Sequence, residues 1–336
     1  MTRNLVVTLA LLVLAGCGNT ASGKQGGEAS NFAANGAGGS PSEVAGGSVD
    51  CNRFSPAGKP PQILNEKLAD GTQRLCYRSF AVGYSTKSRT PIWSAEYLTT
   101  DAIDLAHRVT RIDDFHPEMQ LAPNARSELS DYRASGYDRG HMAPNGDMPT
   151  PAAALESFTL TNIAPQAAGL NRRSWEDLEK AVRRQTRGGP VFVVTGPLFA
   201  ANGGMLKTTH TDHRVFVPTH VYKAIYALDR GATVFIATNE DQPRWESMTV
   251  DQFTQVYRID PFPGMQPKFR TVNGATDGSL SLGRGGPRGS NESANSSVLG
   301  PHTEIRDRTT GQTVDLNTYH LFHGGRDPGA DEIVHY

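Results

Sequence analysis

The sequence predicts an α+β domain built mainly on an antiparallel sheet. Short segments rich in β-branched and aromatic residues, each bounded by Gly, Pro or Asn, recur along the chain, which is typical of strands. One segment instead places apolar residues at helical spacing. Because strands both precede and follow that single helix, the order of elements favours an antiparallel sheet.

The expected strands begin with a hairpin. Two apolar runs at residues 79–84 and 91–98 flank the polar stretch STKSRT, which is how a hairpin appears in a sequence. Four further strands are expected at residues 158–163, 191–196, 221–228 and 233–237.

The one expected helix begins near Asn171 or Ser174. Ser174 and Asp177 fit a capping box, which marks a helix start. Trp175 and Leu178 open an apolar stripe that continues at helical spacing, so this helix should pack on the sheet.

The N-terminus has the pattern of an export signal. One arginine precedes an apolar run from Leu5 to Leu14, which is too short to cross a bilayer. The run ends in Leu14-Ala15-Gly16-Cys17, which resembles the lipobox of bacterial lipoproteins. Residues 1–17 are therefore expected to be a lipoprotein signal peptide with lipid on Cys17. The protein would be exported and anchored to a bacterial membrane, at the outer membrane or on the periplasmic side. An ordinary signal peptide is the alternative.

Composition divides the remainder of the chain into three parts. Residues 18–50 are rich in Gly, Ala, Ser and Asn and predict a disordered tether. Residues 51–272 have the length and apolar content of one domain. Residues 273–336 begin with a Gly- and Ser-rich stretch and predict a low-complexity mobile tail.

Two cysteines belong to the predicted domain. In an exported protein Cys51 and Cys76 are expected to pair, because a disulfide persists in an oxidising compartment. A free catalytic thiol is the alternative for either one. The formal net charge of −1 excludes a global basic field, so attraction to a nucleic acid would have to be local.

Three polar clusters carry the candidate chemistry. They are Asp138-Arg139-Gly140-His141, the segment TNIAPQ at residues 161–166, and the segment LNRRSWEDLE at residues 170–179. Together with VVTGP at residues 193–197 and VPTHVYKAIY at residues 217–226, they resemble the DNA/RNA non-specific endonucleases. These are ββα-metal, or His-Me finger, nucleases with a DRGH motif. The resemblance implies a ββα-metal catalytic motif within the predicted sheet domain.

The resemblance implies that His141 is a general base. A neutral imidazole with a pKa near 6.5 can take a proton from water. Arg139 would face the phosphate, because a guanidinium group matches phosphate oxygens. Gly140 allows the chain to turn between them, and Asp138 is expected to support Arg139 or the local backbone. The alternatives are a buried structural histidine and a solvated surface arginine.

The resemblance also implies a metal site. Asn171 matches the family's metal ligand, a single amide oxygen on a Mg²⁺ ion that keeps most of its waters, with Mn²⁺ as the alternative ion. From capping preferences alone, Asn171 would be a helix N-cap. Glu179 follows by 179 − 171 = 8 residues and could accept hydrogen bonds from those waters. Asn162 matches a position that supports the site.

One family arginine lies upstream of DRGH, where Arg108 and Arg111 are both available. Arg111 is the better match, because an acidic and aromatic stretch follows it. The basic residues on and beyond the helix, including Arg172 and Arg183, could follow a phosphate backbone without contacting bases, or could form a solvated face.

The sequence therefore predicts a Mg²⁺-dependent, sugar-non-specific endonuclease that hydrolyses phosphodiester bonds of DNA and RNA. A catalytically silent nucleic-acid-binding lipoprotein is the first alternative. A phosphodiesterase acting on another extracellular phosphoester is the second.

Overall fold

The computed structural model describes residues 50–200, 203–207 and 215–271, and also gives the bounds of three short strands, β1, β15 and β16. All of these belong to the second of two compact units, residues 41–336. The predicted signal peptide, Cys17, nearly all of the predicted tether and most of the predicted tail lie outside the described residues.

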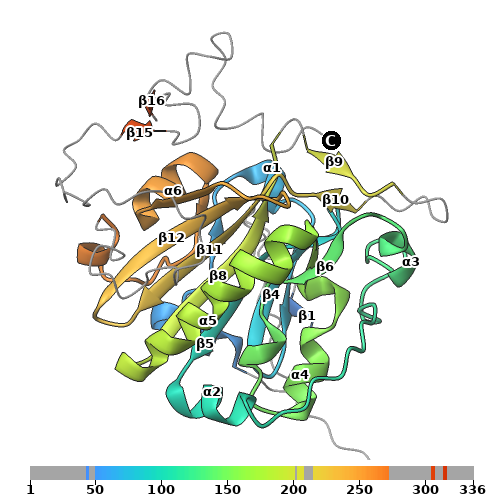
Figure 1. Ribbon diagram of the computed structural model, residues 1–336, viewed down its shortest axis with the longest axis horizontal. Coiled ribbons are helices and arrows are strands. Elements are labelled where there is room, and N and C mark those ends of the chain that lie inside the picture. The colour runs from blue at the N-terminus through green and yellow to red at the C-terminus, as the bar shows by residue number, and fades with distance from the viewer. Residues whose placement is uncertain are drawn as a thin grey trace, which may run out of the picture. The chain divides into compact units, whose positions relative to one another are not determined.

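An eight-stranded sheet forms the centre of the described domain (Figure 1). Every strand pairs antiparallel to its neighbours except β1, which runs parallel to β3. The predicted class, α+β with a mainly antiparallel sheet, is confirmed. In spatial order the strands are β1 (Glu43–Val44), β3 (Thr72–Cys76), β4 (Phe80–Ser85), β5 (Thr90–Leu98), β8 (Val191–Leu198), β11 (His220–Ala227), β12 (Gly231–Thr238) and β13 (Trp245–Met248).

Four two-stranded ladders accompany the central sheet. They are β2 (Gln62–Ile63) with β14 (Ile259–Asp260), β6 (Asp138–His141) with β7 (Ile163–Gln166), β9 (Gly204–Met205) with β10 (Phe216–Val217), and β15 (Glu304–Arg306) with β16 (Thr313–Asp315). The α-helices are α1 (Glu66–Ala69), α2 (Thr100–Ala106), α3 (Leu129–Tyr132), α4 (Pro151–Ser157), α5 (Glu176–Gln185) and α6 (Val250–Tyr257). No helix among the described residues is long and apolar enough to span a membrane.

Most of the predicted strands are present, but one prediction was wrong in part. The hairpin is β4 and β5, and three of the four later strands are β8, β11 and β12. Residues 160–162, however, form a short helical turn, η4 (Leu160–Asn162), and only Ile163 of the predicted strand enters β7. The turn is possible because the buried Asn162 side chain bonds several neighbouring groups, so these β-branched and apolar residues are buried without a sheet ladder.

The expectation of a single helix was also wrong. Helices α2, α4 and α6 each follow a threonine whose side chain accepts a hydrogen bond from the first turn. Thr249 and Gln252 form a complete capping box at α6. Threonine caps and the proline at the start of α4 were signals in the sequence that could have predicted these helices.

The helix that carries the candidate site does not begin at a capping box. Helical structure begins at Ala168, passes through a π-helical segment, η5 (Leu170–Trp175), and runs directly into α5. Ser174 therefore lies inside the helix, and its hydroxyl has no partner among the described residues. The backbone amide of Asn171 donates to the Ala167 carbonyl at 2.9 Å, as in a helical turn, so Asn171 is not the N-cap.

The two faces of the sheet are covered by different helices, because strand side chains alternate between faces. On β11, Val221 and Ile225 pack with Leu178 of α5, which crosses the front of the sheet in Figure 1. Tyr222 and Ala224 point to the other face, whose core includes Phe253 of α6. Lys223 alternates with Tyr222 and therefore points toward α5.

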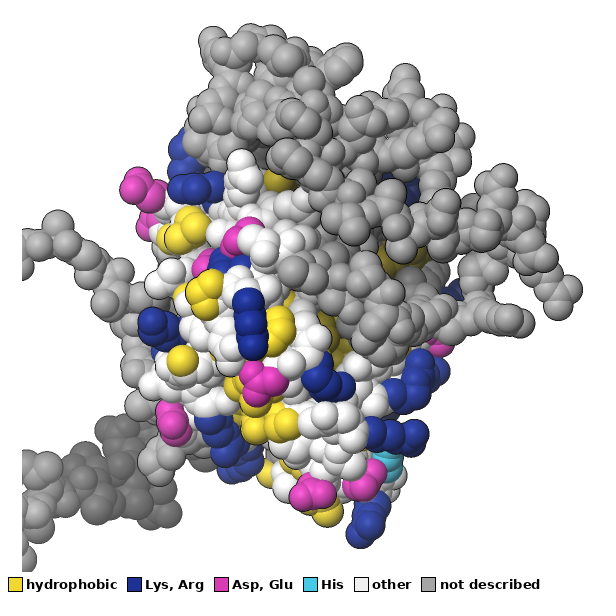
Figure 2. Space-filling model, turned by 90° about the vertical axis from the view of Figure 1, so that its left-hand side faces the viewer, with side chains coloured by type: hydrophobic (Ala, Val, Ile, Leu, Met, Phe, Trp, Pro, Cys, Tyr) yellow, Lys and Arg dark blue, Asp and Glu magenta, His cyan; other side chains and the backbone are white. Residues whose placement is uncertain are grey.

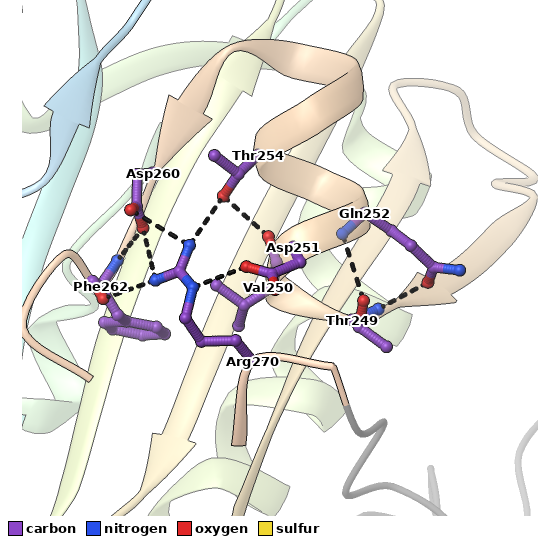
Figure 3. A network of polar contacts seen from close by, with 8 residues as sticks. All are labelled: Thr249, Val250, Asp251, Gln252, Thr254, Asp260, Phe262 and Arg270. Atoms are coloured by element: carbon purple, nitrogen blue, oxygen red, sulfur yellow. Dashed lines mark hydrogen bonds and ion pairs between the residues drawn. The ribbon is translucent and has the colours of Figure 1, made fainter. Parts of the chain in front are cut away.

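A disulfide and a hydrogen-bond network connect outer segments of the domain. The predicted disulfide between Cys51 and Cys76 is confirmed and joins the segment before β2 to β3. Arg270 ties the end of the described domain to α6 and β14 (Figure 3): its guanidinium bonds Asp251 at 2.6 Å, Asp260 at 3.1 and 3.2 Å and the Phe262 carbonyl at 3.0 Å.

Candidate active site

The DRGH residues form β6, the first strand of a ββα unit. β6 pairs antiparallel with β7, so that Arg139 lies opposite Pro165 and His141 lies opposite Ile163. The helix η5–α5 follows β7 after a short connection. A Cβ on Gly140 would lie 2.2 Å from the Gln166 side-chain oxygen, so a glycine is required where that side chain crosses β6.

His141 lies against two aromatic rings. The imidazole centroid is 4.9 Å from that of Phe158, nearly edge-on, and 5.4 Å from that of Phe115. Burial, followed by the charges of Arg111 and Arg139, lowers the pKa of His141 to about 3, although Asp113 opposes this. The sequence suggested an ordinary histidine pKa, because it gave no sign of this aromatic enclosure. His141 is therefore neutral at physiological pH, as a base must be.

One imidazole nitrogen is better placed than the other to accept a proton. Nε2 is buried and has no hydrogen-bond partner among the described residues. Nδ1 is therefore the nitrogen that water can reach.

Two arginines lie against the same pair of aromatic rings. The Arg139 guanidinium carbon is 4.1 Å from the centre of the Phe115 ring, and that of Arg111 is 5.1 Å from the centre of the Phe158 ring. Contacts of this kind hold a guanidinium in place while leaving it charged. Arg111 acts electrostatically on His141, whereas Arg108 is exposed at the end of α2 and makes no such contact within the described residues.

A backbone bridge brings the upstream segment to this place. The His116 amide donates to the Phe158 carbonyl at 3.3 Å, and the Leu160 amide donates to the His116 carbonyl at 2.8 Å. This pairing sets Phe115 beside Phe158. The two phenylalanines were missed by sequence reasoning, and their only signal was aromatic character close to the polar clusters.

Asp138 connects β6 to the helix. Its carboxylate accepts from the Asn171 side-chain amide at 2.9 Å and from two nitrogens of Arg172 at 2.7 and 2.5 Å. Burial raises its pKa, but the hydrogen bonds from Arg172 and Asn171 outweigh this, and the pKa lies below its usual value. Asp138 was expected to support Arg139 or the local backbone, but its side-chain hydrogen bonds go to the helix instead, and Arg139 only adds a favourable charge.

The bond to Asp138 fixes the orientation of the Asn171 amide. Because Nδ2 donates to the carboxylate, Oδ1 is the remaining atom and has no partner among the described residues. An amide oxygen is a ligand that Mg²⁺ accepts, so the donor chemistry fits this ion. Within the described residues, no group of three or more His, Cys, Asp or Glu is arranged to hold a metal.

Glu179 lies on the same helix as Asn171, above a buried group of charged residues. Burial, opposed by Lys223 and assisted by Asp147, raises the pKa of Glu179 to about 7. Lys223 is 1% exposed, donates to Thr195 Oγ1 at 2.7 Å and lies 5.3 Å from the Trp175 ring. Lys223 lies on β11 and Asp147 lies on a turn after β6, so the sequence around Glu179 did not reveal these two charged neighbours.

Two more buried groups belong to this layer. Glu96 of β5 is 0% exposed, and neither of its carboxylate oxygens has a partner among the described residues; burial above all raises its pKa. Arg183 of α5 forms an ion pair with Asp147 at 2.7 Å. The sequence left two interpretations of Arg183 open, contact with a phosphate backbone or a solvated helix face, whereas this ion pair holds it against η3 (Asn145–Asp147).

Asn162 supports the strand that carries His141. It is 0% exposed, and all four of its side-chain hydrogen bonds are made: Oδ1 accepts from Ser94 and from the Ala143 amide, and Nδ2 donates to the carbonyls of Ala143 and Ser157, each at 2.9 Å. Its carbonyl accepts from Met142 at 2.9 Å. Asn162 thereby holds the chain directly after His141 against β5.

Comparison with known proteins agrees with this geometry. The family model of the DNA/RNA non-specific endonucleases matches residues 60–267, which is more than half of the chain. The chain belongs to the DNA/RNA non-specific endonuclease family.

Several named nucleases are similar to the chain. Nuclease C1 of Cunninghamella echinulata var. echinulata is 39% identical over 166 residues, which cover 46% of this chain and 66% of that protein. Mitochondrial endonuclease G of Caenorhabditis elegans is 31% identical over 193 residues, 54% of this chain and 62% of that protein. The chain thus spans slightly less than two thirds of either relative.

A solved structure is also similar. The crystal structure of the EndoG/EndoGI complex contains a chain that is 27% identical, with a TM-score of 0.42, over 62% of this chain and 83% of that one. β6, β7 and the helix η5–α5 all lie within the range that the family model matches.

Proposed function

We propose that this protein is a Mg²⁺-dependent endonuclease that hydrolyses phosphodiester bonds in DNA and RNA, with His141 as general base. One observation carries the proposal. A neutral histidine, an arginine beside it and an asparagine with a free amide oxygen all belong to one ββα unit. Similar proteins are named as nucleases, which supports the same chemistry.

His141 takes a proton from the attacking water through Nδ1. Its low pKa keeps the imidazole unprotonated before the reaction, and approach to an anionic phosphate raises its affinity for the proton. Arg139 and Arg111, both held against aromatic rings, face the phosphate oxygens and stabilise the charge that develops on them.

Asn171 would hold the metal through Oδ1, and Glu179 would accept hydrogen bonds from waters around it. When bound, Mg²⁺ supplies positive charge for the phosphate and for the departing oxygen, and Mn²⁺ is an alternative ion. Asp138 does not react. It orients the Asn171 amide so that the oxygen, and not the nitrogen, is available.

A cleavage assay tests this proposal. Supercoiled plasmid and a single-stranded RNA are each incubated with the protein, with Mg²⁺ and with a chelator. Both substrates should be cut only when Mg²⁺ is present, and His141→Ala should lose about 10²- to 10⁴-fold in rate. Binding without cleavage by the wild type would instead support a silent nucleic-acid-binding protein. Cleavage only of a small phosphodiester would support the phosphodiesterase alternative.

We also propose that the protein is exported and carries lipid on Cys17. The support is the sequence Leu14-Ala15-Gly16-Cys17 at the end of the apolar run. Cys17→Ala should release the protein from the membrane fraction or block maturation, while the folded domain stays active. Membrane association and a mature N-terminal mass that match the wild type would overturn the lipid anchor.

A further inference from the structure

The loop between β12 and β13 holds the segment that leads into the metal-binding helix. Two of its side chains, Asn239 and Asp241, bond backbone groups 72 residues earlier in the chain. These groups belong to Ala167 and Gly169, which connect β7 to η5 and so directly precede Asn171. The loop is outside the DRGH strand and outside the helix.

Asn239 joins three parts of the chain. Its Oδ1 accepts from the Ala167 amide at 2.8 Å, and its Nδ2 donates to the carbonyls of Pro165 at 3.1 Å and Pro218 at 2.9 Å. Its own amide donates to the Thr219 carbonyl at 2.8 Å. An asparagine side chain, with both an acceptor and two donors, suits a position that bonds one backbone amide and two carbonyls.

The Pro165 contact acts on the strand next to the candidate base. Pro165 is paired with Arg139 across the β6–β7 ladder. Asn239 therefore fixes both ends of one connection: β7, which lies beside DRGH, and the residue from which the helix to Asn171 begins. A shift of this connection would move Asn171 relative to Arg139.

Asp241 provides the cap that the helix itself lacks. Gly169 is the residue before η5 and has no side chain to accept a hydrogen bond, but its amide donates to Asp241 Oδ1 at 2.7 Å. A carboxylate near the first free amides of a helix stabilises its start. The approach is close, because a Cβ on Gly169 would lie 2.2 Å from the Asp241 carbonyl oxygen.

We propose that the Asn239–Asp241 loop is a positioning element for Asn171 and sets the affinity of the metal site. The inference rests on the proposed function, in which Asn171 is the metal ligand. Asn239 holds the connection in place, and Asp241 holds the first turn of the helix, so the amide oxygen of Asn171 is directed where the ion binds. Neither residue touches the substrate.

Direct metal binding is the first test. The purified protein is titrated with Mn²⁺, and the loss of the free-ion electron paramagnetic resonance signal gives the dissociation constant. Asn239→Ala should raise that constant about tenfold, the scale of a lost partner behind a metal ligand. Asp241→Ala should raise it less, because its bond to Gly169 is exposed. Asp241→Asn keeps an acceptor oxygen and should recover part of the difference.

Gly169→Ala separates positioning from helix stability. The backbone of Gly169 is helical, at φ −66°, so alanine favours the helix by its intrinsic propensity. The added Cβ would nevertheless press on the backbone of Asp241. Weaker Mn²⁺ binding in Gly169→Ala is the expected result. Binding as tight as wild type would contradict the role of this contact.

Arg270→Ala is the matched control. Like Asn239→Ala, it removes partly buried hydrogen bonds between segments distant in the sequence, but these lie beside α6 (Figure 3). It should lower the urea midpoint and leave the Mn²⁺ constant unchanged. Magnesium titrations of cleavage should agree: half-maximal Mg²⁺ rises in Asn239→Ala, and the rate at saturating metal largely recovers.

The outcomes distinguish the two proposals. If wild type and Asn171→Ala bind Mn²⁺ equally, the metal role of Asn171 fails, and the proposed function fails with it. If Asn171→Ala is weakened but Asn239→Ala and Asp241→Ala match Arg270→Ala, the loop has no positioning role. Should Asn239→Ala fail to fold, the exposed Asp241 variants still decide the question.

Discussion

Glu179 is the residue through which pH should act on the candidate metal site. Burial raises its pKa to about 7, so it is partly protonated near neutrality. A protonated carboxyl cannot accept hydrogen bonds on both oxygens from the waters of a metal ion. Because the folded protein then binds this proton more tightly than the unfolded chain, ionisation of Glu179 lowers stability as pH rises from about 4.5 to about 7.

We therefore predict that the Mg²⁺ requirement depends on pH through Glu179. Lowering the pH from about 8 to about 6 should raise the half-maximal Mg²⁺ concentration in the wild type. Glu179→Gln should need more metal at high pH and respond less to acid. The measurement is initial cleavage rate against Mg²⁺ concentration at each pH. An equal pH response in the two proteins would remove Glu179 from this role.

The pKa of His141 is shifted downward, whereas that of Glu179 is shifted upward. Its pKa of about 3 keeps it neutral in the free protein where an ordinary histidine would be charged. The unfolded chain takes up this proton below about pH 6.5 and the folded protein does not, so the stability contributed by neutral His141 is lost as pH falls toward 3.

This gives a second prediction, on stability. The free energy of urea unfolding should fall between about pH 7 and about pH 5, and the fall should be smaller in His141→Ala, which has no imidazole to protonate. Both proteins are measured in the same buffers. An identical fall in both would mean that His141 is not buried as the structure shows.

At the scale of elements, the helix start shows what the sequence could and could not predict. The apolar stripe of α5 predicted a helix packed on the sheet, since Leu178 and Val182 are periodic. A helix start near Asn171 was close to the observed start at Ala168, but the capping box at Ser174 was wrong, because the carboxylate that accepts from the first turn belongs to Asp241. Capping rules examine only neighbours in sequence, so a cap supplied by another loop leaves no local pattern.

The disulfide is the element-scale feature with the clearest energetic consequence. Cys51 and Cys76 are separated by 25 residues. In the chain-entropy model, a disulfide across such a loop reduces the conformational entropy of the unfolded chain and so stabilises the folded state by about 3 kcal/mol. Replacing both by alanine should lower the free energy of unfolding by this amount and leave the cleavage rate at low temperature unchanged. Urea unfolding and thiol counting check this. Two free thiols in the unreduced wild type would contradict it.

At the scale of the whole molecule, the two faces of the sheet differ. The candidate site lies on the face that packs against α5, and the other face packs against α6 in a hydrophobic core. Strand residues that alternate in sequence, such as Lys223 and Tyr222, point to different faces, and this alternation could be predicted. The environment of each candidate residue could not be predicted, because Phe115, Phe158 and Asn239 come from distant segments. Phe115 and Phe158 lie against His141, and Asn239 bonds the segment that precedes Asn171.

Charge is mixed on the side of the molecule that Figure 2 shows. Basic and acidic side chains are interspersed on the side of the molecule shown in Figure 2, in keeping with the formal net charge of −1. Under the proposed function, a nucleic acid would be attracted locally, by the arginines at the ββα unit, and not by a global field. This agrees with recognition of the phosphate backbone without contacts to particular bases.

A magnesium titration of His141→Ala and Asn171→Ala, on one DNA and one RNA substrate, tests the central claim most directly. The two roles fail differently. His141→Ala should lose rate at every Mg²⁺ concentration and keep the wild-type midpoint, because a base is missing and the metal site is intact. Asn171→Ala should shift the midpoint to higher Mg²⁺ and recover part of its rate at high metal. Full activity in His141→Ala, or a wild-type magnesium curve in Asn171→Ala, would contradict the mechanism.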